Sequence, residues 1–412
     1  MVASGVPNPA AGGATLTNWT ILTYLLERGH DVVVVPLLAP GFVDATGTDA
    51  SDRLRDVRAM GAEVVPVEAA GSRPLGEPSR AVVARFRRVW RPEDDLLMPY
   101  LHDRDAVGAA LRQAQADVAF VYHWEALAAT SGVTGVPRLG VAVDLVHLPA
   151  LYRWRAEIRR PRASTLRAVV RLQAQVRRQP QLMVRLMNAC AASGDFAAHH
   201  AAWLRGRGAT HCEYLRTPVP DPGRPAASDR VPRPRVLLIG HLKGTATRDG
   251  LGLFAHQILP RLERELGADG FEVRIVGGFE APPVLQRALD RPSVEFVGHL
   301  EDPSSEFRDA HVMVVPTTIP LGTRVRILSA FSFGCCVVAH RSNALGIPEL
   351  AHGGNVLLGG SGAELAQAVV DAVRDPSLRD GIRAGGRATY ERFFAPPVAA
   401  GRIEEILTRI AP

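Results

Sequence analysis

Lysine is almost absent from this sequence. Of 48 lysines and arginines only Lys243 is a lysine, and the formal net charge is a modest +6. A small net charge with both signs mixed does not indicate nucleic-acid binding. The arginine bias fits a GC-rich, bacterial genome better than a special mechanism.

Cysteine is scarce as well, and the spacing of the cysteines excludes a CxxC redox pair and a zinc site. Cys190, Cys212, Cys335 and Cys336 form no CxxC pair and no His/Cys pattern of a zinc site. Two of them stand inside an apolar run, so we expect reduced thiols that fill a core. The chain also shows no signal-peptide pattern and no apolar run of about 20 residues, the length that spans a bilayer. We therefore expect a cytoplasmic protein.

The dinucleotide-binding fingerprint GxGxxG is missing, although the N-terminal segment alternates as a strand, a glycine loop, a helix and a buried strand. The first strand is expected within Met1–Gly5, and the helix over Leu16–Arg28, ending at Gly29. Gly12 and Gly13 lie in the loop between them. Without the fingerprint, this pattern does not support a nicotinamide cofactor.

The chain does have size and regular alternation. With 412 residues and 47% apolar composition it can form two full cores. Apolar strands alternate with helices on both sides of segment 217–234, which holds six prolines. We predict an α/β protein with two Rossmann-like domains that face a cleft: an N-terminal domain over 1–216, this linker, and a C-terminal domain over 235–394.

Four predicted elements bear on the later description. In the first domain we expect a helix at Arg80–Trp90 and the last strand at Ala191–Ser193. In the second domain the glycines of His241–Gly250 predict a loop, followed by a helix over Leu251–Leu266.

Polar residues follow two predicted strands of the first domain. His123 follows the strand Asp117–Tyr122, and Asp144 and His147 follow the strand Arg138–Val143. Because ligands bind at the carboxyl ends of parallel strands, these side chains are catalytic candidates. A lone histidine in such a place is more often a hydrogen-bonded loop residue, and that interpretation stays open.

Residues 152–186 differ in composition from the rest of the chain. They carry ten arginines against one acid, Glu157, with apolar residues at a helical period between them. This pattern is typical of a basic amphipathic helix, so residues 153–185 are a candidate peripheral contact with the inner face of a membrane, or with an acidic acceptor. The alternative is a solvated, arginine-rich face on an ordinary helical insert.

The segment Pro320–Glu349 has the pattern of a glycine turn, a short helix, a buried strand and a second turn. Gly322 and Thr323 would leave backbone N–H groups at a helix start, where an anion is favoured. Arg324 and Arg326 stand beside them and offer planar, permanently charged donors. We expect a phosphate or diphosphate site; the alternative is a strand–helix–strand unit with surface arginines.

Several motifs of the second half fall in the order found in one enzyme family. They are Gly240-His241-Leu242, Arg248-Asp249-Gly250-Leu251, Ile275-Val276-Gly277-Gly278, Val294-Glu295-Phe296-Val297-Gly298, Gly322-Thr323-Arg324-Val325-Arg326-Ile327-Leu328 and Gly346-Ile347-Pro348-Glu349. In these motifs the chain resembles the retaining glycosyltransferases of family 4, which have the GT-B fold of two facing Rossmann-like domains. The first half agrees more loosely, through Gly12-Gly13 and Pro218-Val219-Pro220-Asp221.

This resemblance implies a donor site and a set of catalytic groups. Arg324 and Arg326 would hold the donor diphosphate, and Arg248 would add a further cation. Gly13 would let the opposing backbone approach, and residues 395–412 would form a helix that crosses back to the first domain. The implied donor-binding residues are Gly12, Gly13, Gly240, Gly278, Gly322, Thr323, Arg326, Ser329 and Glu349, and the catalytic candidates are Arg324, Arg248, His123, His147 and Asp144.

Three positions depart from the family pattern. Most members have two glutamates eight positions apart, one for the transferred sugar and one for the ribose, whereas this chain has Leu321 and Ser329 there. A hydrogen bond to a charged acceptor contributes roughly 1.5–3 kcal/mol, so the loss of a carboxylate weakens binding unless another group replaces it. Val143 also stands before Asp144, where members often have a histidine.

The expected function is transfer of a sugar from a nucleotide diphosphate donor to a hydroxyl acceptor, a small molecule or a glycan. It would proceed with retention and need neither a metal nor a cofactor, because arginines neutralise the leaving diphosphate. A second hypothesis is a degenerate member that binds a partner or a sugar nucleotide without turnover. A third is another reaction on this fold, such as epimerisation, or phosphorolysis, in which Lys243 has no assignable role.

Overall fold

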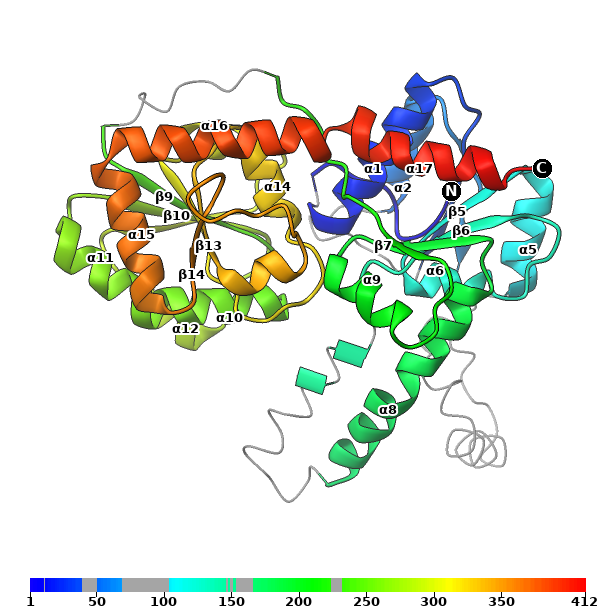
Figure 1. Cartoon of the computed structure of the whole chain (residues 1–412), viewed down its shortest axis with the longest axis horizontal. Coiled ribbons are helices and arrows are strands. Elements are labelled where there is room, and N and C mark those ends of the chain that lie inside the picture. Colours follow the sequence, from blue (N-terminus) through cyan, green and yellow to red (C-terminus); the bar gives the residue numbers. More distant parts are fainter. Residues whose placement is uncertain are drawn as a thin grey trace.

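The computed structural model describes residues 1–10, 12–38, 50–68, 104–145, 147–148, 151–152, 166–223 and 232–412. Two parallel β-sheets, each covered by helices, lie side by side (Figure 1). The first sheet with its helices is called the first domain below, and the second sheet with its helices the second domain. The predicted helix at Arg80–Trp90 and most of the arginine-rich segment before residue 166 lie outside the described residues.

The first sheet has the strand order β3-β2-β1-β5-β6-β7-β8, with β4 paired to β2. Its strands are β1 (Val2–Ser4), β2 (Val33–Leu38), β3 (Glu63–Val64), β4 (Val67–Glu68), β5 (Ala119–Tyr122), β6 (Arg138–Val141), β7 (Ala192–Asp195) and β8 (Cys212–Tyr214). Its helices are α1 (Gly13–Glu27), α2 (Ala50–Ala59), α5 (Arg104–Gln113), α6 (Trp124–Ala129), α8 (Leu166–Asn188) and α9 (Ala198–Arg205). The prediction that Ala191–Ser193 is the last strand was wrong, because β8 follows it and is too short to show a period.

The end of α1 confirms the prediction that this helix ends at Gly29. Gly29 has a φ of 84°, a backbone conformation that suits glycine. Its N–H donates to the carbonyl of Leu26, and the N–H of His30 donates to the carbonyl of Leu25. This pair of bonds is a Schellman motif, which ends the helix and turns the chain into β2.

The second sheet has the strand order β11-β10-β9-β12-β13-β14. Its strands are β9 (Arg235–Ile239), β10 (Glu272–Val276), β11 (Val294–Gly298), β12 (Val312–Val315), β13 (Val337–His340) and β14 (Leu357–Gly359). Its helices are α10 (Thr245–Leu253), the π-helical turn η1 (Phe254–Ile258), α11 (Leu259–Leu266), α12 (Pro283–Ala288), α13 (Ser304–Asp309), α14 (Val325–Ser332), the 3₁₀ turn η2 (Arg341–Leu345), α15 (Gly362–Arg374) and α16 (Pro376–Phe393).

The loop predicted at His241–Gly250 was wrong in its second half, because α10 already begins at Thr245. Gly250 lies against β12's outgoing loop, and a Cβ there would sit 3.1 Å from the Oγ1 of Thr317. The carboxylate of Asp249 accepts the N–H of Thr318 at 2.6 Å. The glycine therefore allows this helix to pack closely rather than ending it.

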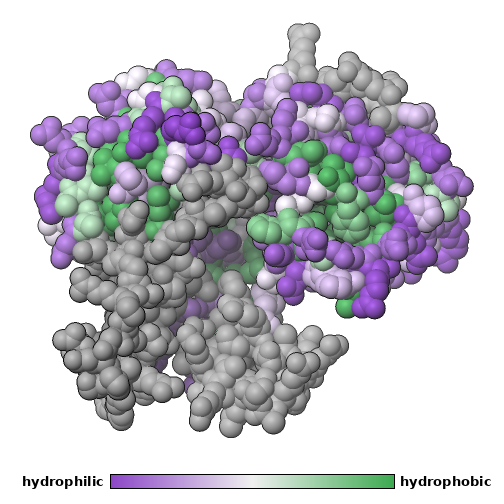
Figure 2. Space-filling model, turned by 180° about the vertical axis from the view of Figure 1, so that it is seen from behind, coloured by the Kyte–Doolittle hydropathy of each residue, from purple (hydrophilic) through white to green (hydrophobic). Residues whose placement is uncertain are grey.

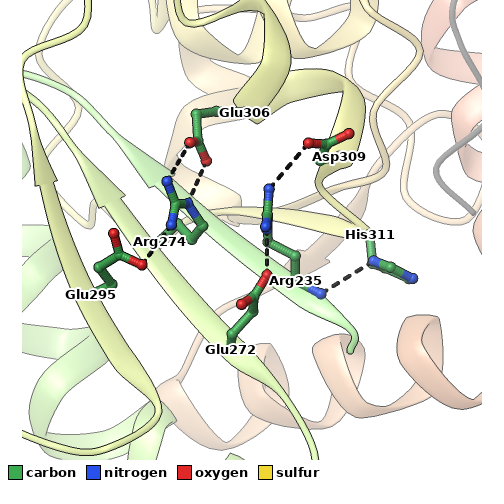
Figure 3. A network of polar contacts seen from close by, with 7 residues as sticks. All are labelled: Arg235, Glu272, Arg274, Glu295, Glu306, Asp309 and His311. Carbon is green, nitrogen blue, oxygen red and sulfur yellow. Dashed lines mark hydrogen bonds and ion pairs between the residues drawn. The ribbon is translucent and has the colours of Figure 1, made fainter. Parts of the chain in front are cut away.

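Two arginines join strands β9, β10 and β11 of the second sheet to α13 (Figure 3). Arg274 on β10 donates through Nε and Nη2 to both carboxylate oxygens of Glu306, at 2.8 and 2.6 Å, and through Nη1 to Glu295 on β11 at 2.6 Å. Arg235 on β9 pairs with Glu272 and, at 3.3 Å, with Asp309. Bidentate pairs of this kind fix geometry, so the network holds strand register in this domain.

The chain crosses between the domains twice. After β8 it enters the second domain near Val219, and after α16 it returns as α17 (Pro396–Ile410), which packs on α1 and β6 (Figure 1). The two crossings are bonded to each other: the Val219 N–H donates to the Phe394 carbonyl at 3.1 Å, and the Tyr390 hydroxyl donates to the Val219 carbonyl at 3.0 Å. On the first domain, Glu404 of α17 accepts the Tyr24 hydroxyl at 3.1 Å.

Helix α8 extends away from the first sheet (Figure 1) and contains Pro180. Its C-terminal end is buried in the first core through Met183, Leu186 and Met187. None of the helices in the described ranges combines the length and apolar character needed to cross a bilayer.

Candidate active site

A cavity of about 820 Å³ lies between the two domains. The first domain lines it with the start of α1 and with residues that follow β6 and β7, and the second domain with residues that follow β9, β10 and β11 and with the start of α14. Seen from behind, the surface is hollowed between the two domains (Figure 2). The cavity thus lies at the carboxyl ends of both parallel sheets, where ligands bind in such folds.

The turn between β12 and α14 carries two arginines to the cavity wall. Gly322 has a φ of 58°, Arg324 is the N-cap of α14, and the helix begins at Val325. Arg324 and Arg326 both line the cavity. The first N–H groups of a helix have no partner within it, so this helix start adds partial positive charge beside the two guanidinium groups.

Neither guanidinium group has an ion pair in the described part of the chain. Arg324 donates to the carbonyl of Ile319 at 3.0 Å, and its Nε has no hydrogen-bond partner among the described residues. Arg326 donates to the carbonyl of Ile239 at 2.5 Å and to the hydroxyl of Thr247 at 3.4 Å. Donors therefore remain for a ligand in the cavity.

The charged forms of Arg324 and Arg326 are both electrostatically unfavourable in this structure. Burial lowers the pKa of Arg324, while Asp144 and Asp249 partly oppose the shift by attraction. Burial, and then repulsion from Arg324, lowers the pKa of Arg326 to about 9. A bound anion would relieve both effects, so the two arginines form a candidate anion site.

Asp144 faces these arginines from the first domain and lines the cavity. Its Oδ1 lies against the arginine turn, since a Cβ built on Gly322 would be 2.3 Å from it. Asp144 lies between the domains, and its side chain is exposed to the cavity. Partial loss of solvation there raises the pKa of its carboxyl despite attraction from His123 and Arg324. The structure therefore brings this predicted catalytic residue to the site.

The two predicted catalytic histidines do not line the cavity. His123 has a φ of 80° and its Nδ1 is 2.7 Å from Glu125 Oε2. Burial opposes the charge on this ring, but the hydrogen bond and attraction of Glu125 outweigh it and raise the pKa of His123. His147 is buried and stacked on Trp203 at 4.6 Å, and burial lowers the pKa of its ring to about 4.

Arg248 and Glu349 also lie outside the cavity lining. The early start of α10 places Arg248 inside the helix with an exposed side chain. Glu349 accepts the hydroxyl of Tyr214 at 3.0 Å and the Nε of Arg216 at 2.8 Å, and only 8% of its side chain is exposed. This carboxylate, predicted to bind the donor, instead joins the second domain to the residues around β8.

The other predicted donor-binding positions are near the arginines. Gly240 lets Arg326 approach, because a Cβ there would lie 2.5 Å from Nη1 of that arginine. Leu321 and Ser329, which replace the two family glutamates, line the cavity as well. The acids among the described lining residues are Asp144, Glu301 and Asp302. The remaining predicted residues that line the cavity are Gly12, Gly13, Gly278 and Thr323.

The backbone of the arginine turn differs from the prediction. The Gly322 N–H donates to His200 Nε2 at 3.4 Å, and the Thr323 hydroxyl donates to the carbonyl of Phe196. Gly322 itself does not line the cavity. Its N–H, predicted to bind an anion, is thus engaged by the first domain.

The sequence interpretation missed His200, which makes this contact, together with its neighbours His199 and Asp195. Asp195 ends β7, and the two histidines open α9. The rule that polar residues at carboxyl ends of strands gather at one edge could have found them. The prediction that β7 ends at Ser193 removed Asp195 from consideration.

Comparisons with known proteins agree with this architecture. Residues 233–375 match the family model described as "Glycosyl transferases group 1". No curated protein sequence matches the chain.

Among solved structures, the chain is similar to a sucrose-phosphate synthase from Thermosynechococcus elongatus, with a TM-score of 0.70 and 15% identity over 99% of this chain and 98% of that one. It is also similar to Anabaena HepE in complex with UDP and glucose, with a TM-score of 0.66 and 15% identity over 99% and 98%. A third similar structure is S. aureus TarM in complex with fondaparinux, α-GlcNAc-glycerol and UDP, with a TM-score of 0.68 and 8% identity over 99% and 98%.

The predicted fold class is confirmed: the chain has two Rossmann-like domains in the GT-B arrangement over its full length. Within its second half, residues 233–375 match a group 1 glycosyltransferase model, which supports the prediction of a glycosyltransferase for this domain. The finer resemblance to family 4, with its glutamate pair, stays a prediction.

Proposed function

We propose that the protein transfers a sugar from a nucleoside diphosphate donor to a hydroxyl acceptor, with retention of configuration. The observation that carries this proposal is the pair Arg324 and Arg326 on the cavity wall, both with lowered pKa values and without ion pairs in the described residues. Two adjacent cations that disfavour each other's charge match a diphosphate, which carries charge on both phosphates.

The same pair supports a mechanism that needs no metal ion or cofactor. As the bond between the sugar C1 and the donor diphosphate oxygen breaks, negative charge grows on the leaving diphosphate. Arg324 and Arg326 stabilise this charge where it develops, helped by the start of α14. The acceptor oxygen bonds to C1 on the same face, and its proton passes to the departing diphosphate oxygen. Asp144 lies across the cavity from the two arginines and accepts a hydrogen bond from a hydroxyl of the acceptor or of the sugar.

The partners follow from the same site. The donor would be a nucleotide sugar, and the acceptor a glycan or a small molecule that enters from the first-domain side. HepE was solved with UDP and glucose, and TarM with UDP, fondaparinux and α-GlcNAc-glycerol, which makes UDP the first probe to use. Arg248 remains a predicted additional cation, and His123 and His147 remain predicted catalytic groups, although none of the three lines the cavity.

The test is isothermal titration with UDP, GDP, ADP, CDP and dTDP. We expect one of them to bind, and binding of none would contradict the donor site. Hydrolysis of the matching nucleotide sugar, followed with the purified protein, then separates an enzyme from a binding protein. Retention is checked by the anomeric configuration of the product.

A second function is favoured by one observation. Leu321 and Ser329 line the cavity where the resembled family has carboxylates for sugar and ribose. A protein that binds a sugar nucleotide or a partner transferase without turnover would keep the arginines and lose these acids. Binding of a nucleoside diphosphate without hydrolysis or transfer would favour this function, or another GT-B reaction such as epimerisation.

The predicted membrane contact through residues 153–185 also stays a proposal, together with a location at the inner membrane face. The basic composition of this segment supports it. Flotation with vesicles that contain phosphatidylglycerol tests it, with phosphatidylcholine vesicles as the control. Absence of binding to the anionic vesicles at low salt would remove the idea.

A further inference from the structure

The turn that carries Arg324 is held by the first domain as well as by its own. His199 Nε2 lies 3.1 Å from the carbonyl oxygen of Pro320, and His200 Nε2 accepts the Gly322 N–H at 3.4 Å. Thr323 donates its hydroxyl to the carbonyl of Phe196. Pro320, Gly322 and Thr323 thus contact one segment, Phe196–His200, at the junction of β7 and α9.

His200 has a defined role in this contact because of its tautomer. Its Nε2 accepts a hydrogen bond from the Gly322 N–H, so the proton of the neutral ring must sit on Nδ1. Nδ1 lies 3.5 Å from Asp195 Oδ1, and that carboxylate oxygen also accepts the N–H of Ala197 at 2.7 Å. His200 is 1% exposed and Asp195 is 0% exposed. A buried carboxylate beside Nδ1 favours the tautomer that leaves Nε2 free to accept.

We propose that Asp195 and His200 are positioning residues that act through Gly322: they fix the arginine turn, and with it Arg324, against the cavity wall. Asp195 sets the tautomer of His200, and His200 holds the Gly322 N–H. Gly322 is two residues before Arg324, the N-cap of α14. The diphosphate site of the second domain is therefore shaped by a buried polar pair of the first domain. The role of the diphosphate in this inference depends on the proposed function, whereas the restraint on the turn does not.

The surrounding contacts argue that the turn needs such a restraint. Gly322 has a φ of 58°, and glycine gives the backbone there little intrinsic rigidity. Arg324, with burial lowering its pKa, is in an unfavourable electrostatic position and would move toward solvent if the turn were free. A second backbone bond between the domains, from the Ala198 N–H to the Gly346 carbonyl at 3.1 Å, keeps α9 beside the turn.

The experiment compares His200→Leu with His200→Gln in the full-length protein. Leucine fills the space but cannot accept a hydrogen bond, whereas the glutamine amide oxygen reaches about as far as Nε2 and can accept the Gly322 N–H. The exposed residue His211, outside the cavity lining, provides the matched control His211→Leu. Two readouts are used: hydrogen–deuterium exchange of the backbone over residues 319–327, and affinity for UDP and for inorganic diphosphate.

We expect exchange in this segment to rise about tenfold or more in His200→Leu, and affinity for diphosphate to fall by about the same factor. His200→Gln should restore most of both, and His211→Leu should match the wild type. Unchanged exchange in His200→Leu would overturn the inference, and so would a loss that glutamine fails to rescue while the thermal midpoint stays the same. If the wild type binds neither UDP nor inorganic diphosphate, the exchange result still tests the restraint, and the donor site alone fails.

Discussion

The two walls of the cavity differ in the polar groups that they carry. On the second domain the wall carries two arginines that lack ion pairs in the described residues and whose pKa values are lowered by burial. On the first domain Asp144 is at the cavity, and the buried pair Asp195 and His200 contributes the contact with the arginine turn through His200. One wall has cationic donors without ion pairs in the described residues, and a buried histidine of the other domain contacts the turn that carries them. Binding is therefore proposed for one domain and positioning for the other.

The largest expected effect is on the cationic wall. Arg324→Ala should weaken nucleoside diphosphate binding tenfold or more, because a charged phosphate contact contributes roughly 1.5–3 kcal/mol. Isothermal titration measures it, and Arg261→Ala, an exposed arginine of α11, is the control. If both variants bind equally well, the contrast between the walls is wrong.

A pH experiment tests the first domain at a histidine behind the cavity. The pKa of His147 is about 4 in the folded protein, well below its ordinary value of 6.5. Between these values the unfolded chain binds more protons, so the free energy of unfolding rises with pH through this window and falls on acidification. From pH 7 to pH 5 the loss attributable to this ring should be about 2 kcal/mol.

Urea unfolding at the two pH values measures this loss. His147→Leu should remove about that share of the pH dependence, since leucine can still pack on Trp203. An equal pH dependence in the variant and the wild type would mean that His147 is not held neutral by burial.

Replacing the second arginine should separate stability from binding. Arg326→Met removes a charge that burial and Arg324 disfavour, and the thioether chain still fills the space. We expect the free energy of unfolding without ligand to rise by about 1 kcal/mol while diphosphate affinity is lost. Denaturant unfolding and titration on the same sample check both, and a destabilised variant would show that the bond to the Ile239 carbonyl matters more than the charge.

The smallest expected effect tests the contact between the two walls. Gly322 and Gly353 both have positive φ, at 58° and 75°, but a Cβ at Gly353 meets nothing within 4 Å, whereas one at Gly322 meets Asp144. Each alanine variant carries the backbone strain, roughly 1–2 kcal/mol. Gly322→Ala should lower the free energy of unfolding by about 1 kcal/mol more than Gly353→Ala, because the Asp144 carboxylate must shift. Thermal unfolding of the two variants measures this difference. Equal losses would indicate that the domains do not touch there in solution.

The second domain was the easier half to predict from the sequence. Strands β9, β12 and β13 show apolar runs, and the order of its glycine motifs resembles a known family. The sequence alone therefore singled out Arg324 and Arg326, which line the cavity, and their binding of a diphosphate stays a prediction. What sequence could not show is the direction of a side chain. Glu349 stands at a motif position, yet its carboxylate turns to Tyr214 and Arg216.

The first domain was harder because its important groups act at a distance along the chain. His200, which has Asp195 beside it, contacts a turn more than 120 positions away, as the separation of His200 and Gly322 shows. No local period or spacing encodes such a partner. The same limit explains His147, which the strand-end rule brings to the right edge of the sheet but which packs on Trp203.

The two crossings of the chain, bonded to each other between Val219, Tyr390 and Phe394, have a mechanical consequence. A pair of rigid bodies joined at one point can twist and tilt in any direction, whereas a second attachment fixed to the first leaves chiefly rotation about the line through them. Sliding of one domain along the other would break those bonds. Any opening of the cavity should therefore be an angular motion, so that displacement grows in proportion to distance from that line.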